Sequence, residues 1–231
     1  MEDWWTYSLS DFLMFAPRTY YRMLERHNEA VWPGQIISVG MGLGILALLP
    51  RPSLRRGAII AVAMGILWAW IAWSFLWTRY AGISWPMKYI VPLFVVESLL
   101  LLWTGIVRRQ LSFQLRSDTR GVLGVGLFAL AVILYPMMAP IFGRPLQQAE
   151  VFGIAPDPTV IATLGLLLLA DGGRPWPLLV IPTLWCLITG ATLWALQSPE
   201  TFVTLGAAIL GVAAAGSRRS LEPARERAKQ G

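Results

Sequence analysis

Residues 57 to 78 read GAIIAVAMGILWAWIAWSFLWT, a stretch without a charged side chain. About 20 consecutive apolar residues are enough for a helix to cross the roughly 30 Å hydrocarbon core of a bilayer. The rest of the chain has the same character, because 56% of its 231 residues are hydrophobic and 14% are charged. Soluble domains carry roughly 25% charged residues. The sequence therefore predicts an all-α integral membrane protein whose first partner is the lipid bilayer.

Six further apolar runs, each bounded by charged residues or proline, complete a predicted bundle of about seven transmembrane helices. The seven candidate spans are residues 33–49, 57–78, 86–107, 121–142, 158–170, 176–196 and 200–215. The fifth is short, because a helix of that length would measure only about 20 Å. Two prolines, Pro156 and Pro158, interrupt the apolar residues at its start, which predicts a short or broken span.

Lysine and arginine side chains divide unevenly between the two sides of this predicted bundle. Thirteen fall on the side of the C-terminal tail and six on the other side. Loops on the cytoplasmic side of a membrane are enriched in these residues. We therefore expect the C-terminus in the cytoplasm and the N-terminus outside. The first five residues lack the basic and apolar regions of a cleavable signal peptide, so we expect the N-terminus to be retained.

The N-terminal segment has a different pattern from the spans. Residues 9–29 alternate apolar and basic side chains in a rough helical rhythm, which is typical of an amphipathic helix lying on a membrane surface. We expect it to turn into the bilayer at Trp32-Pro33, because tryptophan favours the interface and proline favours the first helical turn. The predicted parts are an outer-face segment 1–32, a transmembrane bundle 33–215 and a charged cytoplasmic tail 216–231.

Polar residues gather where the first span begins, and they are His27, Asn28, Glu29 and Gln35. Imidazole, carboxylate and amide groups that converge at the outer mouth of a bundle are suited to binding a cation or a polar solute. The alternative is that these four side chains are solvated at the membrane surface beside an anchored helix and have no further role.

Glu97 is the most unusual residue of the third span. It lies about eleven residues beyond Pro86, or roughly 16 Å along a helix, which places it near the bilayer centre. A carboxylate there costs at least about 2.5 kcal/mol on insertion scales. We expect Glu97 to face the interior, either as a neutral hydrogen-bond donor or as a group that handles protons or cations in a water-lined cavity.

Asp157 lies between the two prolines at the start of the fifth run. We interpret it as an N-cap residue, with Pro158 in the first helical position and the carboxylate satisfying exposed N–H groups. The alternative is that irregular backbone at membrane depth lines a cavity here, as it does in transporters with broken helices.

Tryptophan and glycine patterns indicate contact surfaces. Trp70, Trp73 and Trp77 form one stripe on the second span, which favours lipid or interhelical packing. Small residues allow close helix approach, and they occur at Gly40 and Gly44, Ala207 and Gly211, and at glycines 121, 124 and 126. Membrane-protein partners or self-association through these faces are therefore possible interactions.

Several classes of function are disfavoured. One histidine and one cysteine do not make a two-histidine or thiolate metal site, and no phosphate loop or serine elbow occurs, so we predict no metal, no cofactor and no catalytic residues. The net charge of +6 comes from short loops and a tail rather than one basic face, so we expect no nucleic-acid binding. We therefore expect that the chain is not an enzyme.

Three motifs are similar to those of an uncharacterised family of bacterial multi-pass membrane proteins. They are Asn28-Glu29-Ala30-Val31-Trp32-Pro33-x-Gln35, Phe152-Gly153-Ile154-Ala155-Pro156-x-Pro158-Thr159 followed by four leucines at 166–169, and Val180-Ile181-Pro182-x-Leu184-Trp185. The resemblance implies a bacterial inner membrane protein and supplies no activity. Members of that family often carry cysteine where this chain has Asp157, and aspartate would favour a harder cation or no metal.

The resulting functional hypothesis is transport. A small solute, a cation or a proton would pass the outer polar cluster and continue along Glu97. The alternative hypothesis is a structural or accessory subunit of a larger membrane complex, held by the tryptophan and glycine faces.

Overall fold

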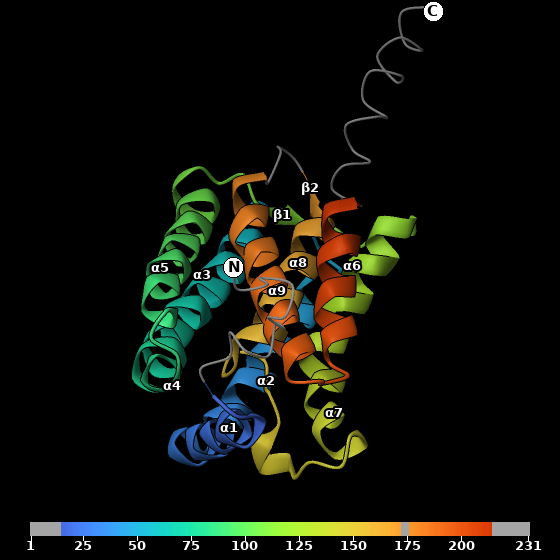
Figure 1. The fold of residues 1–231 in the computed structure, drawn as a ribbon. Helices are drawn as coiled ribbons and strands as arrows, with labels where there is room; N and C mark the ends of the chain where they lie inside the picture. Colours follow the sequence, from blue (N-terminus) through green and yellow to red (C-terminus); the bar gives the residue numbers. More distant parts are fainter. Residues whose placement is uncertain (1–14, 172–175, 214–231) are drawn as a thin grey trace, which may run out of the picture.

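The computed structural model describes residues 15–171 and 176–213. Within these ranges the chain is helical apart from short connections and one antiparallel pair of two-residue strands, β1 (Ser112–Phe113) and β2 (Ala170–Asp171) (Figure 1). The predicted cytoplasmic tail and the first part of the predicted amphipathic segment lie outside the described residues. The all-α prediction is confirmed for the part of the chain described.

Four helices are long and apolar enough to cross a membrane, and they run from Leu54–Ile83, Met87–Val107, Thr119–Ile141 and Trp176–Ala195. Each of the first three contains a π-helical segment. The first consists of α3 (Leu54–Ile71), η3 (Ala72–Tyr80) and α4 (Ala81–Ile83), and the second of α5 (Met87–Leu102) and η4 (Trp103–Val107). The third consists of α6 (Thr119–Ala129), η5 (Leu130–Leu134) and α7 (Tyr135–Ile141). The fourth is α9 (Trp176–Ala195). Ser53 and Asp118 cap the first and third, each accepting a hydrogen bond from a backbone N–H three residues later.

A bent pair of helices precedes these four. α1 (Pro17–Val31) and α2 (Gly34–Leu48) meet at 86° around Trp32-Pro33, whose peptide bond is cis. One face of α1 is buried, with Tyr20, Met23, Leu24 and His27 along it. The predicted turn at Trp32-Pro33 is present, although the second helix begins at Gly34. The position of α1 on a membrane surface stays a prediction.

The centre of the bundle is α8 (Pro156–Leu169), in which every residue is buried. It packs against α3, α6 and α9, as Figure 1 shows. The non-helical residues 149–155 that lead into it are buried as well. The fifth predicted span is therefore short, as expected, and its helix begins at Pro156 after an irregular buried segment. The charge-poor sequence of α8 suits this position, because each of its faces contacts protein.

The predicted number of about seven spans stays a prediction. By length and composition the described residues contain four candidate spans, or five if α1 and α2 together form one broken span. α8 and the last helix, Thr201–Ala213, are apolar but shorter. The remaining short element is a single 3₁₀ turn, η6 (Leu146–Gln148), in the connection between α7 and α8.

Close helix approach occurs where α6 crosses α8. A Cβ atom on Gly165 would lie 2.7 Å from the carbonyl oxygen of Gly124, and one on Gly124 would lie 2.8 Å from that of Gly165. The prediction of glycine packing is therefore confirmed at Gly124. Gly40, Gly44 and Gly126 make no such contact within this chain, because a Cβ atom at each of these would meet nothing within 4 Å, and their packing against other chains stays a prediction.

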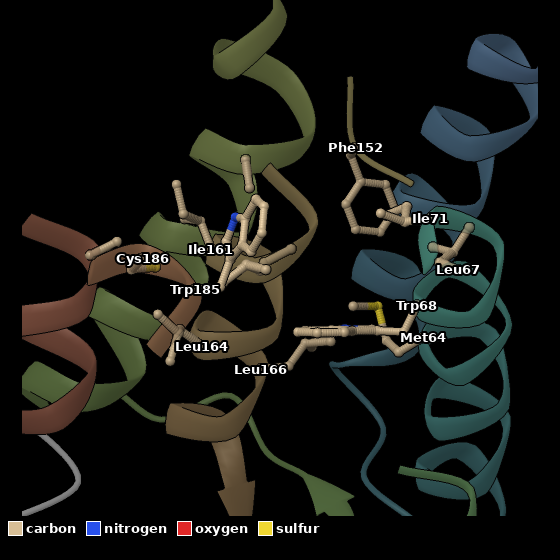
Figure 2. Close-up of a cluster of buried hydrophobic side chains, with 14 of the residues drawn as sticks. Met64, Leu67, Trp68, Ile71, Phe152, Ile161, Leu164, Leu166, Trp185 and Cys186 are labelled. Atoms are coloured by element: carbon tan, nitrogen blue, oxygen red, sulfur yellow. The ribbon is translucent and has the colours of Figure 1, made fainter. Parts of the chain in front are cut away.

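Aromatic side chains fill the space between α3, α5, α8 and α9. The ring of Phe94 lies 4.5 Å from that of Trp68 and 5.0 Å from that of Trp185, measured between centroids. Figure 2 shows Trp68 and Trp185 on opposite sides of this core, with Phe152 from the segment before α8 beside Leu67 and Ile71. The predicted tryptophan stripe lies on the long helix Leu54–Ile83, which also carries Trp68. It faces outward, since Trp70, Trp73 and Trp77 are 43%, 63% and 49% exposed.

Candidate functional site

Asp157 lies in the first turn of α8, where it is almost completely buried. Its two carboxylate oxygens accept hydrogen bonds from α9. The indole Nε1 of Trp185 donates to Oδ1 at 2.7 Å, and the hydroxyl of Thr189 donates to Oδ2 at 2.9 Å. The carboxylate therefore links α8 to α9.

The prediction that Asp157 caps the helix is wrong. The N-cap residue is Ala155, which has no side-chain acceptor, and Pro156 occupies the first turn. Thr159 organises the preceding segment instead, because its hydroxyl accepts from the Gly153 N–H at 2.7 Å and donates to the Ala155 carbonyl at 2.9 Å. Gly153 itself has φ of +74°, a conformation that favours glycine. The Asp157 carboxylate is thus free to face α9.

A second acidic side chain, Glu150, is buried in the connection that leads into α8. The hydroxyl of Tyr20 on α1 donates to its Oε1 at 3.2 Å, while Oε2 has no hydrogen-bond partner among the described residues. Burial and the nearby Asp157 carboxylate raise the pKa of Glu150 well above its ordinary value, against smaller opposing effects of Arg144 and Tyr20. Glu150 therefore retains a proton more readily than a carboxyl group in water.

Buried tyrosines surround these two acids. Tyr80 and Tyr135 interact electrostatically with both carboxyl groups, and the Tyr135 hydroxyl also acts on Asp157 as a hydrogen-bond donor. We refer to the group as the carboxylate–tyrosine site, and it consists of Glu150, Asp157, Tyr20, Tyr80 and Tyr135. The elements that supply it are α1, η3, α7, the segment before α8, and α8 itself.

Among the described residues, the charge of Arg144 acts on Glu150 and Tyr135. Its guanidinium forms a salt bridge with Glu200 and lies 4.4 Å from the centroid of the Tyr21 ring. The hydroxyl of Ser198 donates to the same Glu200 carboxylate. Because Arg144 is already paired, it offsets the charge of Glu150 only from a distance. Ionisation of both acids would leave excess negative charge in a buried place.

The four polar residues predicted at the first span do not form one cluster. His27 turns into the bundle, where its Nε2 lies 3.3 Å from the Ile154 carbonyl and its ring contacts Phe75 edge to face. Burial lowers the pKa of His27 to about 4, with a smaller opposing effect of the Ile154 carbonyl, so the imidazole is neutral at pH 7. Its Nδ1 has no partner among the described residues.

Asn28 on α1 and Gln35 on α2 are hydrogen-bonded to each other across the bend between the two helices. The Asn28 amide donates to the carbonyls of Gln147 and Ala149, each at 2.8 Å, and the Gln35 amide donates to the Asn28 carbonyl at 2.8 Å. Asn28 thereby holds the chain immediately before Glu150. Structural tethering accounts for both amides.

Glu29 is exposed at the rim of a surface pocket of about 350 Å³ next to this tether. The pocket is lined by Asn28, Glu29, Trp32, Gln35, Leu146, Gln147 and Val151. Val151 directly follows Glu150 in the chain. The pocket therefore reaches to within one residue of the carboxylate–tyrosine site.

Glu97 faces the interior, as predicted, but it is separate from the other candidates. It is completely buried on α5, and neither carboxylate oxygen has a hydrogen-bond partner among the described residues. The adjacent Ser98 donates to the Gly65 carbonyl on α3 at 2.7 Å, which places this part of α5 in a helix contact. The pocket beside Glu29 does not include Glu97. The expected path from the first span to Glu97 is not supported.

Sequence reasoning identified Asp157 but missed Glu150 and the tyrosines. Glu150 lies in a connection between two apolar runs, where a charged residue is normally solvated. One signal was available, because an apolar segment, Val151 to Ala155, follows it directly without a helical pattern. Buried irregular backbone of that kind commonly lines a functional cavity. Three or more His, Cys, Asp or Glu side chains arranged for a metal ion do not occur in the described residues.

Comparison with known proteins gives a family without an assigned activity. A family model described as "Family of unknown function (DUF6064)" matches residues 18–225. No curated protein and no solved structure matches the chain. The match covers all of the candidate site residues and agrees with the resemblance noted from the motifs. This chain belongs to the family of unknown function DUF6064.

Proposed function

We propose that this membrane protein transports protons or a small cation through the carboxylate–tyrosine site. One observation carries the proposal: two acidic side chains, Glu150 in the segment before the short helix α8 and Asp157 in its first turn, are both buried and interact electrostatically. Ionisable groups inside membrane proteins are costly, and they commonly mark ion or proton pathways. The proposal gives the chain no catalytic role.

The chemistry of the site suits a single positive charge. Two like charges in a buried place do not both ionise easily, so the pair favours holding one proton or one cation between them. The Trp185 and Thr189 donors stabilise the ionised form of Asp157. Glu150 has one oxygen without a hydrogen-bond partner among the described residues, so it is available to a transferred proton.

Access to the site runs from the pocket beside Glu29. Gln147 and Val151, which line this pocket, flank Glu150 in the chain, and Asn28 holds the residues before Glu150 by two hydrogen bonds. We infer that movement of these residues opens and closes the route. The lysine and arginine bias supports an outer-face position for this end.

A flux assay tests the proposal. The full-length chain is reconstituted in liposomes that enclose a pH-sensitive dye, and a pH gradient is imposed with the membrane potential clamped. We expect proton flux above that of protein-free liposomes, and its loss in Glu150→Gln and in Asp157→Asn. Glu97→Gln is the matched control, since Glu97 is also a buried carboxyl group but lies outside the site. A sodium gradient at equal pH separates cation flux from proton flux.

Two results contradict the proposal. One is the absence of both proton and sodium flux with folded wild-type protein. The other is equal flux in wild type and in the Glu150→Gln and Asp157→Asn variants. Thermal unfolding of each variant in detergent shows whether a loss of flux reflects unfolding instead.

The second candidate function, a subunit of a larger membrane complex, is supported by the outward tryptophan stripe on α3 and η3. Trp70, Trp73 and Trp77 are substantially exposed in the single chain, and the open glycines Gly40 and Gly44 give α2 a flat outer face. Measuring the mass of the particle extracted from the membrane in a mild detergent distinguishes the subunit function from the transport function. A complex heavier than the 25.6 kDa chain that dissociates in a Trp70→Leu, Trp73→Leu, Trp77→Leu variant favours the subunit function.

A further inference from the structure

A second pocket, of about 650 Å³, lies between α1 and the end of the first long helix. It is distinct from the carboxylate–tyrosine site, and its lining is dominated by basic side chains. Four arginines line it, and they are Arg18, Arg22, Arg26 and Arg79. We refer to it as the arginine pocket.

Three of these arginines belong to one face of α1. Arg18, Arg22 and Arg26 follow each other at intervals of four residues, so their side chains lie one above the other along the helix. Like charges at this spacing repel and destabilise a helix. Arg79 comes from η3, which packs against α1, and adds a fourth positive charge opposite the row.

No carboxylate neutralises these arginines within the part of the chain that the structure describes. The ion pairs there involve Arg116 and Arg144. Of the acids of α1, Glu25 lines a neighbouring pocket with Arg18 and Arg22 but accepts its hydrogen bond from the Gln148 side chain at 3.2 Å, and Glu29 lines the pocket at the bend. The arginine pocket therefore concentrates unpaired positive charge from two elements.

We propose that the arginine pocket binds a phosphate group. Guanidinium groups form paired hydrogen bonds with phosphate oxygens, and several arginines around one cavity suit a tetrahedral anion with two or more accessible oxygens. A bound phosphate would also relieve the repulsion along α1. This inference does not depend on the proposed transport.

The position of the pocket favours a phospholipid headgroup as the source of that phosphate. Gly82 and Ile83, at the end of the first long apolar helix, form part of the lining, together with the apolar side chain of Met23. The end of a membrane-spanning helix lies at the depth of the headgroups, where a phospholipid phosphate is within reach of arginine side chains. A soluble phosphate compound would use the same chemistry, so the experiment has to separate the two sources.

Native mass spectrometry of the full-length chain in detergent tests the proposal. Phosphatidylglycerol is titrated as the anionic lipid, phosphatidylcholine as a lipid without net charge, and inorganic phosphate and glycerol 3-phosphate as soluble probes. The test variant is Arg22→Gln with Arg79→Gln, which takes one charge from each side of the pocket. The matched control is Arg55→Gln with Arg108→Gln, which removes two charges from exposed arginines outside the pocket.

We expect phosphatidylglycerol to bind more tightly than phosphatidylcholine, with affinity falling by about tenfold or more in the test variant and little in the control. Binding of the soluble probes with the same arginine dependence, at affinity equal to the lipid, supports the phosphate site and assigns a soluble ligand to it. Two results overturn the proposal: equal binding by wild type and test variant, or an equal loss in the control variant. Both variants change exposed or half-buried side chains, so we expect them to fold.

Discussion

The hydroxyl of Tyr20 donates a hydrogen bond to a carboxylate oxygen of Glu150, at 3.2 Å and across 130 residues of sequence. This contact joins α1 to the segment that leads into the central helix. It also makes the first described helix part of the carboxylate–tyrosine site, which the sequence pattern of α1 alone does not indicate.

The first prediction concerns this contact. Tyr20→Phe leaves both oxygens of Glu150 without a donor, and a buried acceptor without a partner costs about 1–3 kcal/mol. We expect that loss in unfolding free energy, measured by thermal or denaturant unfolding in detergent. Tyr89→Phe is the control, because Tyr89 is 71% exposed, and its effect should be within about 0.5 kcal/mol. A combined Tyr20→Phe, Glu150→Gln variant that shows strict additivity would contradict the coupling of the two residues.

The second prediction concerns Asp157. Asp157→Ala leaves the Trp185 indole and the Thr189 hydroxyl without an acceptor inside the bundle. We expect a loss of about 2–5 kcal/mol in unfolding free energy, since breaking buried polar networks is among the most damaging substitutions. Asp171→Ala is the matched control. Its Oδ1 lies 3.6 Å from Nη1 of Arg116 in an ion pair at the surface. Such a pair should contribute at most about 1 kcal/mol to the unfolding free energy. Similar losses in the two variants would contradict the assigned role of Asp157.

The third prediction concerns the crossing of α6 and α8. Gly165→Ala places a Cβ atom 2.7 Å from the Gly124 carbonyl oxygen, where neither backbone yields easily. We expect a loss of about 1–3 kcal/mol or more in unfolding free energy, as overpacked cores show. Gly126→Ala is the control, because its Cβ would meet nothing within 4 Å. That variant should be neutral or gain up to about 1 kcal/mol. Unfolding curves that rank the two variants in the opposite order would show that the helices cross elsewhere.

The fourth prediction is a pH dependence that arises from His27. Its pKa is about 4 in the folded protein against 6.5 for the free side chain, so below pH 6.5 the unfolded state binds more protons. The folded state should therefore lose stability as the pH falls from 6.5 to 4, by at most about 3 kcal/mol. Glu150 acts with the opposite sign, because its raised pKa stabilises the folded state most at low pH.

The comparison with His27→Gln isolates the histidine contribution. Glutamine retains an N–H donor for the Ile154 carbonyl but does not titrate in this range. We expect the difference in midpoint temperature between wild type and variant to grow in favour of the variant as the pH falls from 7 to 5. A difference that stays constant over this range would mean that His27 is not held neutral.

The fifth prediction concerns Glu97. An unpartnered buried carboxyl group destabilises the fold, so Glu97→Met should raise the unfolding free energy by about 1–3 kcal/mol. Glu97→Gln, which keeps the size and polarity, should change it little. A large loss of stability in both variants would reveal a partner for the Glu97 carboxylate.

Much of the architecture is encoded locally and could be predicted. Apolar runs, bounding prolines and a scarcity of charge identify the membrane-spanning helices one at a time, because the cost of placing a helix in a bilayer adds up residue by residue. The bend at Trp32-Pro33 and the broken start of α8 are local as well, since proline marks both. The inward orientation of Glu97 followed from the cost of exposing a carboxylate to lipid.

The composition of the site depended on contacts between distant segments. Whether Asp157 caps its own helix or binds α9 is decided by Trp185 and Thr189, which reach it only after the helices pack. Glu150 is buried because α1 and the connection before α8 come together, and His27 separates from Asn28 because α1 presents them to different neighbours. By itself, the sequence determined which segments are apolar and helical, because that property is additive along the chain. Only the tertiary structure decided which polar groups meet, because their partners are supplied by other helices.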